Sequence, residues 1–226
     1  MKYLKIVLFL AFAFAVGCTD ENDLPLPLSC DFVDFKYYDN SQDFLGERSS
    51  EYLIIGVDTT FTDIEINNLV STLSQFDQNY NFEIHKSGIY KYKEIPLKFN
   101  SPKTCEETTQ IINLLNQNTM VSYAHFTMQT NDCNNLIWQP IGNLCVNSYS
   151  SSISVKVFDE NNLTAMNNLI TQNNLELVAQ NAFMPKWFEL RVTKVAPKDA
   201  LAMANYLYET GVFEYCEPNI TKYPVE

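Results

Sequence analysis

Residues 200–216, near the end of the chain, read Ala-Leu-Ala-Met-Ala-Asn-Tyr-Leu-Tyr-Glu-Thr-Gly-Val-Phe-Glu-Tyr-Cys. Apolar side chains recur at helical spacing from Ala200 to Tyr208, which indicates a helix with one buried face. Gly211 is the residue type that commonly follows the last turn of a helix. The apolar residues after it predict a strand over 212–216, so this stretch indicates a helix that packs on a sheet.

The residues before this helix complete a β-α-β-β-α-β pattern. Alternating apolar and polar residues predict strands at 153–158, 175–179 and 187–192, with Trp187 or Phe188 facing the core. Apolar residues at helical spacing between 163 and 170 predict the first helix of this unit. Pro197 suits the first turn of the second helix.

The earlier half of the chain follows the same plan. Strands are predicted at 53–57, 82–85, 92–99 and 121–126, and helices follow the capping-box pattern Thr62-x-x-Glu65 and the pair Ser101-Pro102. The predicted fold class is α+β, with two tandem ferredoxin-like β-α-β-β-α-β units. Each unit has an antiparallel sheet with two helices on one face, which leaves the other face free for binding.

The N-terminus has the features of a processing signal. Lys2 and Lys5 precede an apolar run over 6–16, which is shorter than the roughly 20 residues needed to span a bilayer. The run ends in Ala15-Val16-Gly17-Cys18, which looks like a bacterial lipobox, so Cys18 is the predicted lipidation site. The only predicted membrane contact is therefore the lipid anchor.

The acidic residues at 19–23 resemble the surface-export signal of Bacteroidetes lipoproteins. They favour the cell surface over the periplasmic face of the outer membrane. The predicted organisation is a lipoprotein signal peptide (1–17), a lipid-anchored tether and N-terminal arm (18–50), a first ferredoxin-like unit (51–130), a linker (131–151) and a second unit (152–226).

The net negative charge of the chain excludes some classes of binding partner. The 226 residues carry a net charge of −12 at pH 7. A polyanion repels phosphate backbones and anionic lipid surfaces, which excludes nucleic-acid binding.

Five cysteines remain once Cys18 is assigned to lipidation. They are Cys30, Cys105, Cys133, Cys145 and Cys216. The number is odd, so at least one is unpaired or pairs between molecules. Cys133 and Cys145 bracket a loop without periodicity and are the favoured disulfide. No Cys or His spacing matches a metal site, so no metal or cofactor is predicted.

The sequence lacks the components of a catalytic site. Asp58 lies in a segment that superficially resembles the aspartate strand of subtilases, but its position indicates a strand end or turn. His85 and His125 fall in strand patterns, and no serine nucleophile motif is present. The chain is therefore predicted not to be an enzyme.

Residues 153–219 resemble the N-terminal prodomain of Bacteroidetes-type subtilisin-like serine proteases, and residues 183–219 resemble its closing half. The most specific matches are Met184-Pro-Lys-Trp187, Ala204-Asn205, Tyr208-Glu-Thr-Gly211 and Glu217-Pro-Asn219. In that family the prodomain assists the folding of its protease and then inhibits it. Its sheet face packs on the protease, and its C-terminal tail enters the substrate cleft. Since no protease follows before Glu226, the resemblance implies a free-standing lipoprotein that binds a subtilisin-like protease in trans.

The resemblance also implies which residues meet the partner. They are Glu217, Pro218, Asn219, Tyr223, Val225 and Glu226. Pro224 has no N–H with which to pair in a cleft, which weakens a product-like mode of inhibition. Two alternatives remain open: a surface binding or adhesion module without a protease partner, and the remnant prodomain of a truncated protease.

Overall fold

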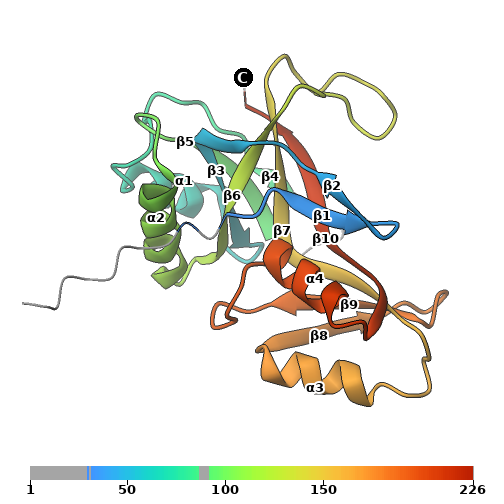
Figure 1. Ribbon diagram of the computed structural model, residues 1–226. Coiled ribbons are helices and arrows are strands. Elements are labelled where there is room, and N and C mark those ends of the chain that lie inside the picture. The colour runs from blue at the N-terminus through green and yellow to red at the C-terminus, as the bar shows by residue number, and fades with distance from the viewer. Residues whose placement is uncertain (1–29, 31, 87–91, 226) are drawn as a thin grey trace, which may run out of the picture.

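The computed structural model describes residue 30, residues 32–86 and residues 92–225 (Figure 1). Its strands are β1 (Phe35–Tyr38), β2 (Ser41–Phe44), β3 (Arg48–Asp58), β4 (His85–Lys86), β5 (Tyr92–Lys98), β6 (Val121–Thr130), β7 (Cys145–Val157), β8 (Leu175–Gln180), β9 (Trp187–Val192) and β10 (Phe213–Pro224). Its helices are α1 (Asp63–Ser71), α2 (Cys105–Gln117), α3 (Thr164–Gln172) and α4 (Ala200–Glu209). The predicted signal peptide, Cys18 and Glu226 lie outside the described residues.

Side-chain caps set where three of the helices begin. Thr62 and Glu65 form the expected capping box at α1. A second box, made by Thr104 and Glu107, starts α2 a turn later than the Ser101-Pro102 pair had indicated. At α4 the carboxylate of Asp199 accepts a hydrogen bond from the Ala202 amide at 2.9 Å.

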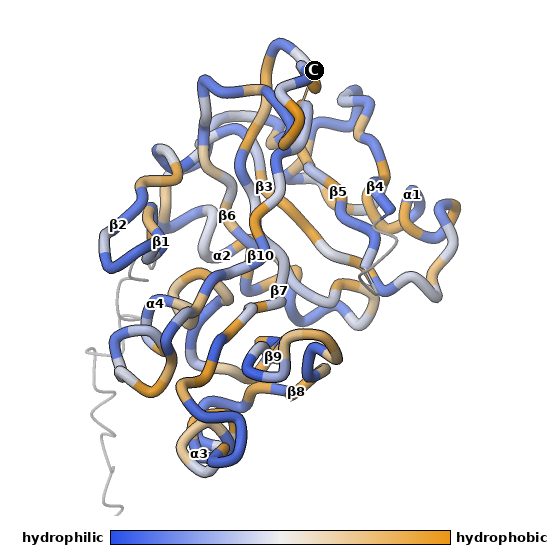
Figure 2. The backbone as a smooth tube through the Cα atoms, turned by 90° about the vertical axis from the view of Figure 1, so that its right-hand side faces the viewer, coloured by the Kyte–Doolittle hydropathy of each residue, from blue (hydrophilic) through white to orange (hydrophobic). Residues whose placement is uncertain are grey.

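The main sheet has eight strands, and every strand pair is antiparallel. Its order is β4-β5-β3-β6-β7-β9-β8. Strands β6 and β9 pair with different stretches along one edge of β7, and β10 pairs with the opposite edge. The hydrophobic strand β3 lies between β5 and β6 (Figure 2). The predicted α+β class, with an antiparallel sheet and four helices, is confirmed in the part of the chain described.

The main sheet has two parts, which we call the first sheet (β4, β5, β3 and β6, with α1 and α2) and the second sheet (β8, β9, β7 and β10, with α3 and α4). Strand β7 joins these two halves. Near its start, Asn147 pairs with Met128 of β6, and further along Val155 pairs with Phe188 of β9. Strand β10 pairs with β7 from Val157 to Cys145, almost its whole length. Residues 145–151 therefore belong to a strand, and their prediction as part of a linker is wrong. Three of these seven residues are serines, and the strand continues through them because β10 pairs with residues 145–149 and β6 with residues 145–147.

The second half covers a sheet face that was expected to be free. Leu53 and Ile55 face the core beneath α1 and α2, so their neighbours Tyr52 and Ile54 point to the opposite face. Both neighbours are buried, and Tyr52 packs with Val146 of β7 and with Val225. The face of the first sheet that lies opposite its helices is thus internal.

The N-terminal arm forms a hairpin of β1 and β2. Asp39 and Asn40 at its turn have φ angles of 45° and 61°, as a type I′ turn requires. The ring of Tyr37 stacks on that of Tyr208 in α4, with centroids 4.6 Å apart. Among the described residues, no helix is long and apolar enough to cross a membrane.

Candidate functional site

The predicted C-terminal tail is part of the sheet. Tyr223 pairs with Val146, and the side chains of Tyr223 and Val225 are only 6% and 2% exposed. An extended tail that enters a partner's cleft would have to leave these positions. The prediction that Tyr223 and Val225 offer their side chains to a partner is therefore wrong for this conformation, because both side chains pack against the first sheet.

The other described members of the predicted partner set lie further back in β10. Glu217 forms an ion pair with Lys36 of the hairpin. Pro218 is buried opposite Ile153. Asn219 donates a hydrogen bond from its side-chain amide to the Ser150 hydroxyl at 3.4 Å. Of these three residues, only Glu217 lies beside the exposed Ser154, on the sheet face that points away from α3 and α4.

A buried carboxylate holds the tail in place. The hydroxyls of Tyr123 and Tyr223 both donate to Glu94, one to each oxygen. Burial and then the charge of Glu94 raise the pKa values of both tyrosines, so both hydroxyls keep their protons. The ring of His85 lies 4.4 Å from that of Tyr223, centroid to centroid. This cluster joins β4, β5 and β6 to β10. Its polar groups bond to one another, so we interpret its role as structural.

The face of the second sheet that lies opposite α3 and α4 is open to solvent. The equivalent face of the first sheet, opposite α1 and α2, is covered. Ser154 is exposed at the centre of the open face, and the register places Glu189 and Glu217 on either side of it. Trp187 and Tyr215 meet edge to face, with ring centroids 5.1 Å apart. We call this surface, formed by Ser154, Lys156, Trp187, Glu189, Arg191, Tyr215 and Glu217, the outer face; Ser152 follows the same alternation but is buried.

Two hollows meet at Trp187. The smaller, about 380 Å³, lies between Trp187 and the 181–186 loop, where Met184 is 50% and Phe183 95% exposed. The larger, about 760 Å³, lies between the outer face and the N-terminal hairpin. Its aromatic lining comprises Tyr37, Tyr38, Phe158, Trp187, Tyr208, Phe213 and Tyr215. Aromatic residues of this kind are enriched at protein interfaces.

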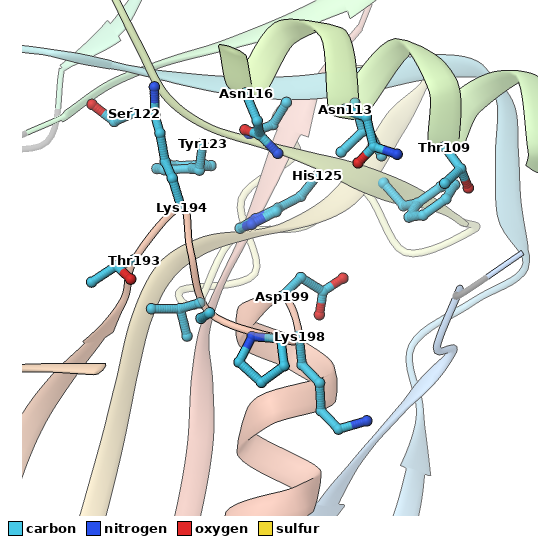
Figure 3. A pocket seen from close by; sticks show the side chains of 16 residues that line it. Thr109, Asn113, Asn116, Ser122, Tyr123, His125, Thr193, Lys194, Lys198 and Asp199 are labelled. Carbon is cyan, nitrogen blue, oxygen red and sulfur yellow. The ribbon is translucent and has the colours of Figure 1, made fainter. Parts of the chain in front are cut away.

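A third cavity, about 220 Å³, lies between the two halves (Figure 3). His125 and Asp199 reach toward it from β6 and from the start of α4. The Nδ1 atom of His125 lies 3.0 Å from the Tyr149 carbonyl oxygen, and the Tyr149 hydroxyl donates to Asp199 at 2.8 Å. Burial lowers the pKa of His125. These polar groups bond to one another, and Asp199 also caps α4. Their contacts therefore indicate a role in stabilising the fold.

No catalytic triad forms in this cavity. Ser122 lines it, but no hydrogen bond joins Ser122 to His125, or His125 to Asp199, among these described residues. His85 and His125 lie in β4 and β6, and Asp58 is the last residue of β3, as the sequence indicated. In the described ranges no three His, Cys, Asp or Glu side chains gather in a way that could hold a metal ion.

The cysteines pair as the sequence indicated in one case. Cys133 and Cys145 form a disulfide with their Cα atoms 5.6 Å apart. A second disulfide, between Cys30 and Cys105, ties the arm to the start of α2. Their separation of 75 residues leaves no local signal from which to predict it. Cys216 is free and buried in β10, and burial raises the pKa of its thiol.

The comparisons with known proteins are sparse. No protein-family model matches the chain, and no curated protein matches it. Among solved structures, the chain is similar to the crystal structure of the acetolactate synthase small subunit from Thermotoga maritima. The match has 10% sequence identity, covers 76% of this chain and 94% of that chain, and has a TM-score of 0.26. A likeness of this degree carries no function over to this chain.

Proposed function

We propose that the chain is a non-catalytic cell-envelope lipoprotein that binds a protein partner through the outer face of its second sheet. The observation that carries this proposal is the contrast between the two sheets. The face of the first sheet opposite its helices is covered by β7 and the end of β10, whereas the outer face exposes Ser154 and leaves Trp187 partly exposed. An uncovered sheet face with aromatic side chains is a common site for protein partners.

The strand orders support a finer description of the fold as two ferredoxin-like units. In the first half the order is β4-β5-β3-β6, and in the second it is β8-β9-β7-β10. Each half runs β-α-β-β-α-β along the chain, and its first and third strands are adjacent. The proposal treats β7 and β10 as strands of the second unit that also close the first.

The proposed partner is a subtilisin-like serine protease, which the chain would inhibit or help to fold. This follows from the resemblance of residues 153–219 to subtilase prodomains. The matching segment Met184-Pro-Lys-Trp187 lies at the rim of the outer face, where Met184 and Trp187 line one hollow. Contact through this face leaves the buried tail in its place.

The alternative is a surface binding or adhesion module without any protease partner. The burial of Tyr223 and Val225 favours this alternative over product-like inhibition, because the tail is not available to a cleft. The predicted lipobox at Cys18 places either version on the outer membrane, with the cell surface as the proposed side.

The test compares two variants with the same substitution. Ser154→Arg puts a long cation at the centre of the outer face, and Ser71→Arg puts it on the exposed end of α1. We expect purified chain to slow a subtilisin-like protease from the same organism. Ser154→Arg should weaken this effect at least about tenfold, a loss typical of a disrupted interface centre, while Ser71→Arg should not.

The readout separates the two candidates. Inhibition that is equal in both variants would place the contact elsewhere and would contradict the outer face as the binding site. If folded chain neither slows nor binds the protease, the protease partner is wrong. In that case, capture of a different envelope protein that is lost only in Ser154→Arg would support the adhesion module.

A further inference from the structure

The loop between β6 and β7 carries an exposed apolar tip. Leu136, Ile137 and Trp138 are consecutive in the sequence and are 100%, 67% and 80% exposed. The loop projects from the body of the molecule, at the top right of Figure 1. Single exposed apolar residues are common on protein surfaces, but three large ones together at a projecting tip indicate a binding site.

The tip is held in shape by its base. The Cys133–Cys145 disulfide closes the loop. The side-chain oxygen of Asn135 accepts hydrogen bonds from the amides of Ile137 and Gln139, both at 3.0 Å. Trp138 has a φ of 61°, a left-handed backbone that costs energy in a residue with a side chain. The apolar side chains are thus presented to solvent by a pre-organised loop.

The loop is also free of charge. No Asp, Glu, Lys or Arg occurs from 133 to 155, and at the base Asp132 forms an ion pair with Lys222. Transfer of the tip into an apolar medium therefore moves no charged group out of water. Trp side chains are also favoured where a headgroup region meets the hydrocarbon.

We propose that Leu136, Ile137 and Trp138 insert into the bilayer leaflet that holds the lipid anchor, and so fix how the tethered protein faces the membrane. This inference rests on the proposed lipid anchor at Cys18. Three side chains bury far less than the roughly 800 Å² per partner of a stable protein interface. A protein already tethered to a bilayer needs only weak insertion to become oriented, because the tether supplies a high local concentration.

The tether permits this orientation. Eleven residues lie between Cys18 and Cys30, where the described chain begins. A chain of that length reaches at most about 40 Å, which is about the diameter of a compact domain of this size. The net charge of −12 would repel an anionic surface, so the preferred leaflet is one of zwitterionic phospholipid.

The test uses the only two tryptophans of the chain as reporters. The mature chain from residue 18, with Cys18→Ser and an N-terminal hexahistidine tag, is held on phosphatidylcholine vesicles by a nickel-chelating lipid. Attachment then does not depend on lipidation. The vesicles carry bromine in their acyl chains, which quenches tryptophans inserted at that depth. Trp187→Phe leaves Trp138 as reporter, and Trp138→Phe leaves Trp187 on the outer face as the matched control.

We expect the Trp138 emission to fall by at least about half, as for a side chain 5–10 Å below the headgroups, and the Trp187 emission to stay unchanged. Replacing Leu136 and Ile137 with serine should abolish the quenching of Trp138. Vesicles rich in phosphatidylglycerol should quench it less. Absence of Trp138 quenching on phosphatidylcholine vesicles, or equal quenching of Trp187, would overturn the proposal.

Membrane fractionation of cells that carry Cys18→Ser tests the anchor separately. Release of the protein from the membrane is expected, because a three-residue tip cannot retain it alone. If this variant and the unchanged chain fractionate alike, the anchor at Cys18 is wrong, whereas the vesicle result still decides whether the tip inserts.

Discussion

At the scale of single residues, the carboxylate of Glu94 connects the C-terminus to the first sheet. Tyr123 and Tyr223 approach it from strands far apart in the sequence and donate their hydroxyl hydrogens to it. A buried carboxylate that loses one of two donors bears a desolvation cost that water cannot offset.

We therefore expect Tyr223→Phe to lower the free energy of unfolding by about 1–3 kcal/mol, measured by urea denaturation near neutral pH. Tyr80→Phe is the matched control, since it also removes a phenol hydroxyl but leaves both donors to Glu94 in place. Its effect should stay within about 0.5 kcal/mol. Equal losses of unfolding free energy in the two variants would show that the hydrogen bonds to Glu94 do not contribute specifically to stability.

The buried His125 predicts how stability responds to pH. Burial lowers its pKa in the folded protein, whereas in the unfolded chain the imidazole titrates near pH 6.5. The unfolded state thus takes up the proton first as the pH falls, so the folded state loses stability below about pH 6.5 and retains it above. Burial lowers the pKa of His85 also, in the same direction.

We expect the urea midpoint to fall between about pH 7.5 and about pH 5.5, and to fall less in His125→Asn. The nearby carboxylate of Asp199 opposes this shift but does not reverse it. Carboxylates with lowered pKa values, such as that of Asp63, destabilise the protein only at lower pH. A fall of unchanged size in His125→Asn would exclude this residue as the cause.

At the scale of elements, local signals in the sequence predicted most of the helices and strands. Thr62 with Glu65 marked the start of α1, and Gly211 marked the end of α4, where its φ of 69° suits glycine. Alternation predicted β9 to the residue. These features depend on neighbours within a few positions, so they can be read without the fold.

The misjudged elements depend on distant partners. The serine-rich stretch 148–152 has no apolar alternation, yet it lies within β7 because β10 pairs with Ser148 and Tyr149 and β9 pairs with Ser152. Residues 82–84 alternate like a strand, but only His85 and Lys86 pair with β5. Long-range pairing decided these cases, and no local pattern encodes it.

The residues of the candidate site also differ in whether the sequence alone could predict their positions. The motif Met184-Pro-Lys-Trp187 could be found in the sequence, and it lies at the rim of the outer face. The burial of Tyr223 could not be foreseen, because it requires Glu94, which is 129 residues away. The run Leu136-Ile137-Trp138 was visible as apolar, but its exposure follows from the disulfide and hydrogen bonds that hold the loop.

At the scale of the whole molecule, the two halves are bound together by the last strand. Residues 220–224 pair with β7, and Tyr223 and Val225 close the face of the first sheet. Loss of the C-terminus should therefore destabilise the first half, although more than 100 residues separate Glu94 from this segment. A tail that served only as a plug for a protease could be removed without this effect.

We expect deletion of residues 220–226 to lower the free energy of unfolding by at least about 4 kcal/mol, because it uncovers Tyr52 and leaves Glu94 with one donor. Lys222→Ala is the control within this segment. It removes an ion pair with the exposed Asp132 and a long hydrogen bond to the Asn134 carbonyl, so its cost should stay below about 1 kcal/mol. Urea denaturation, followed by far-UV circular dichroism and by dye binding to exposed apolar surface, measures both. If the truncated chain keeps its urea midpoint and binds no dye, the end of β10 does not hold the two halves together. The hypothesis that the C-terminal tail leaves the sheet to enter a protease cleft would then be supported.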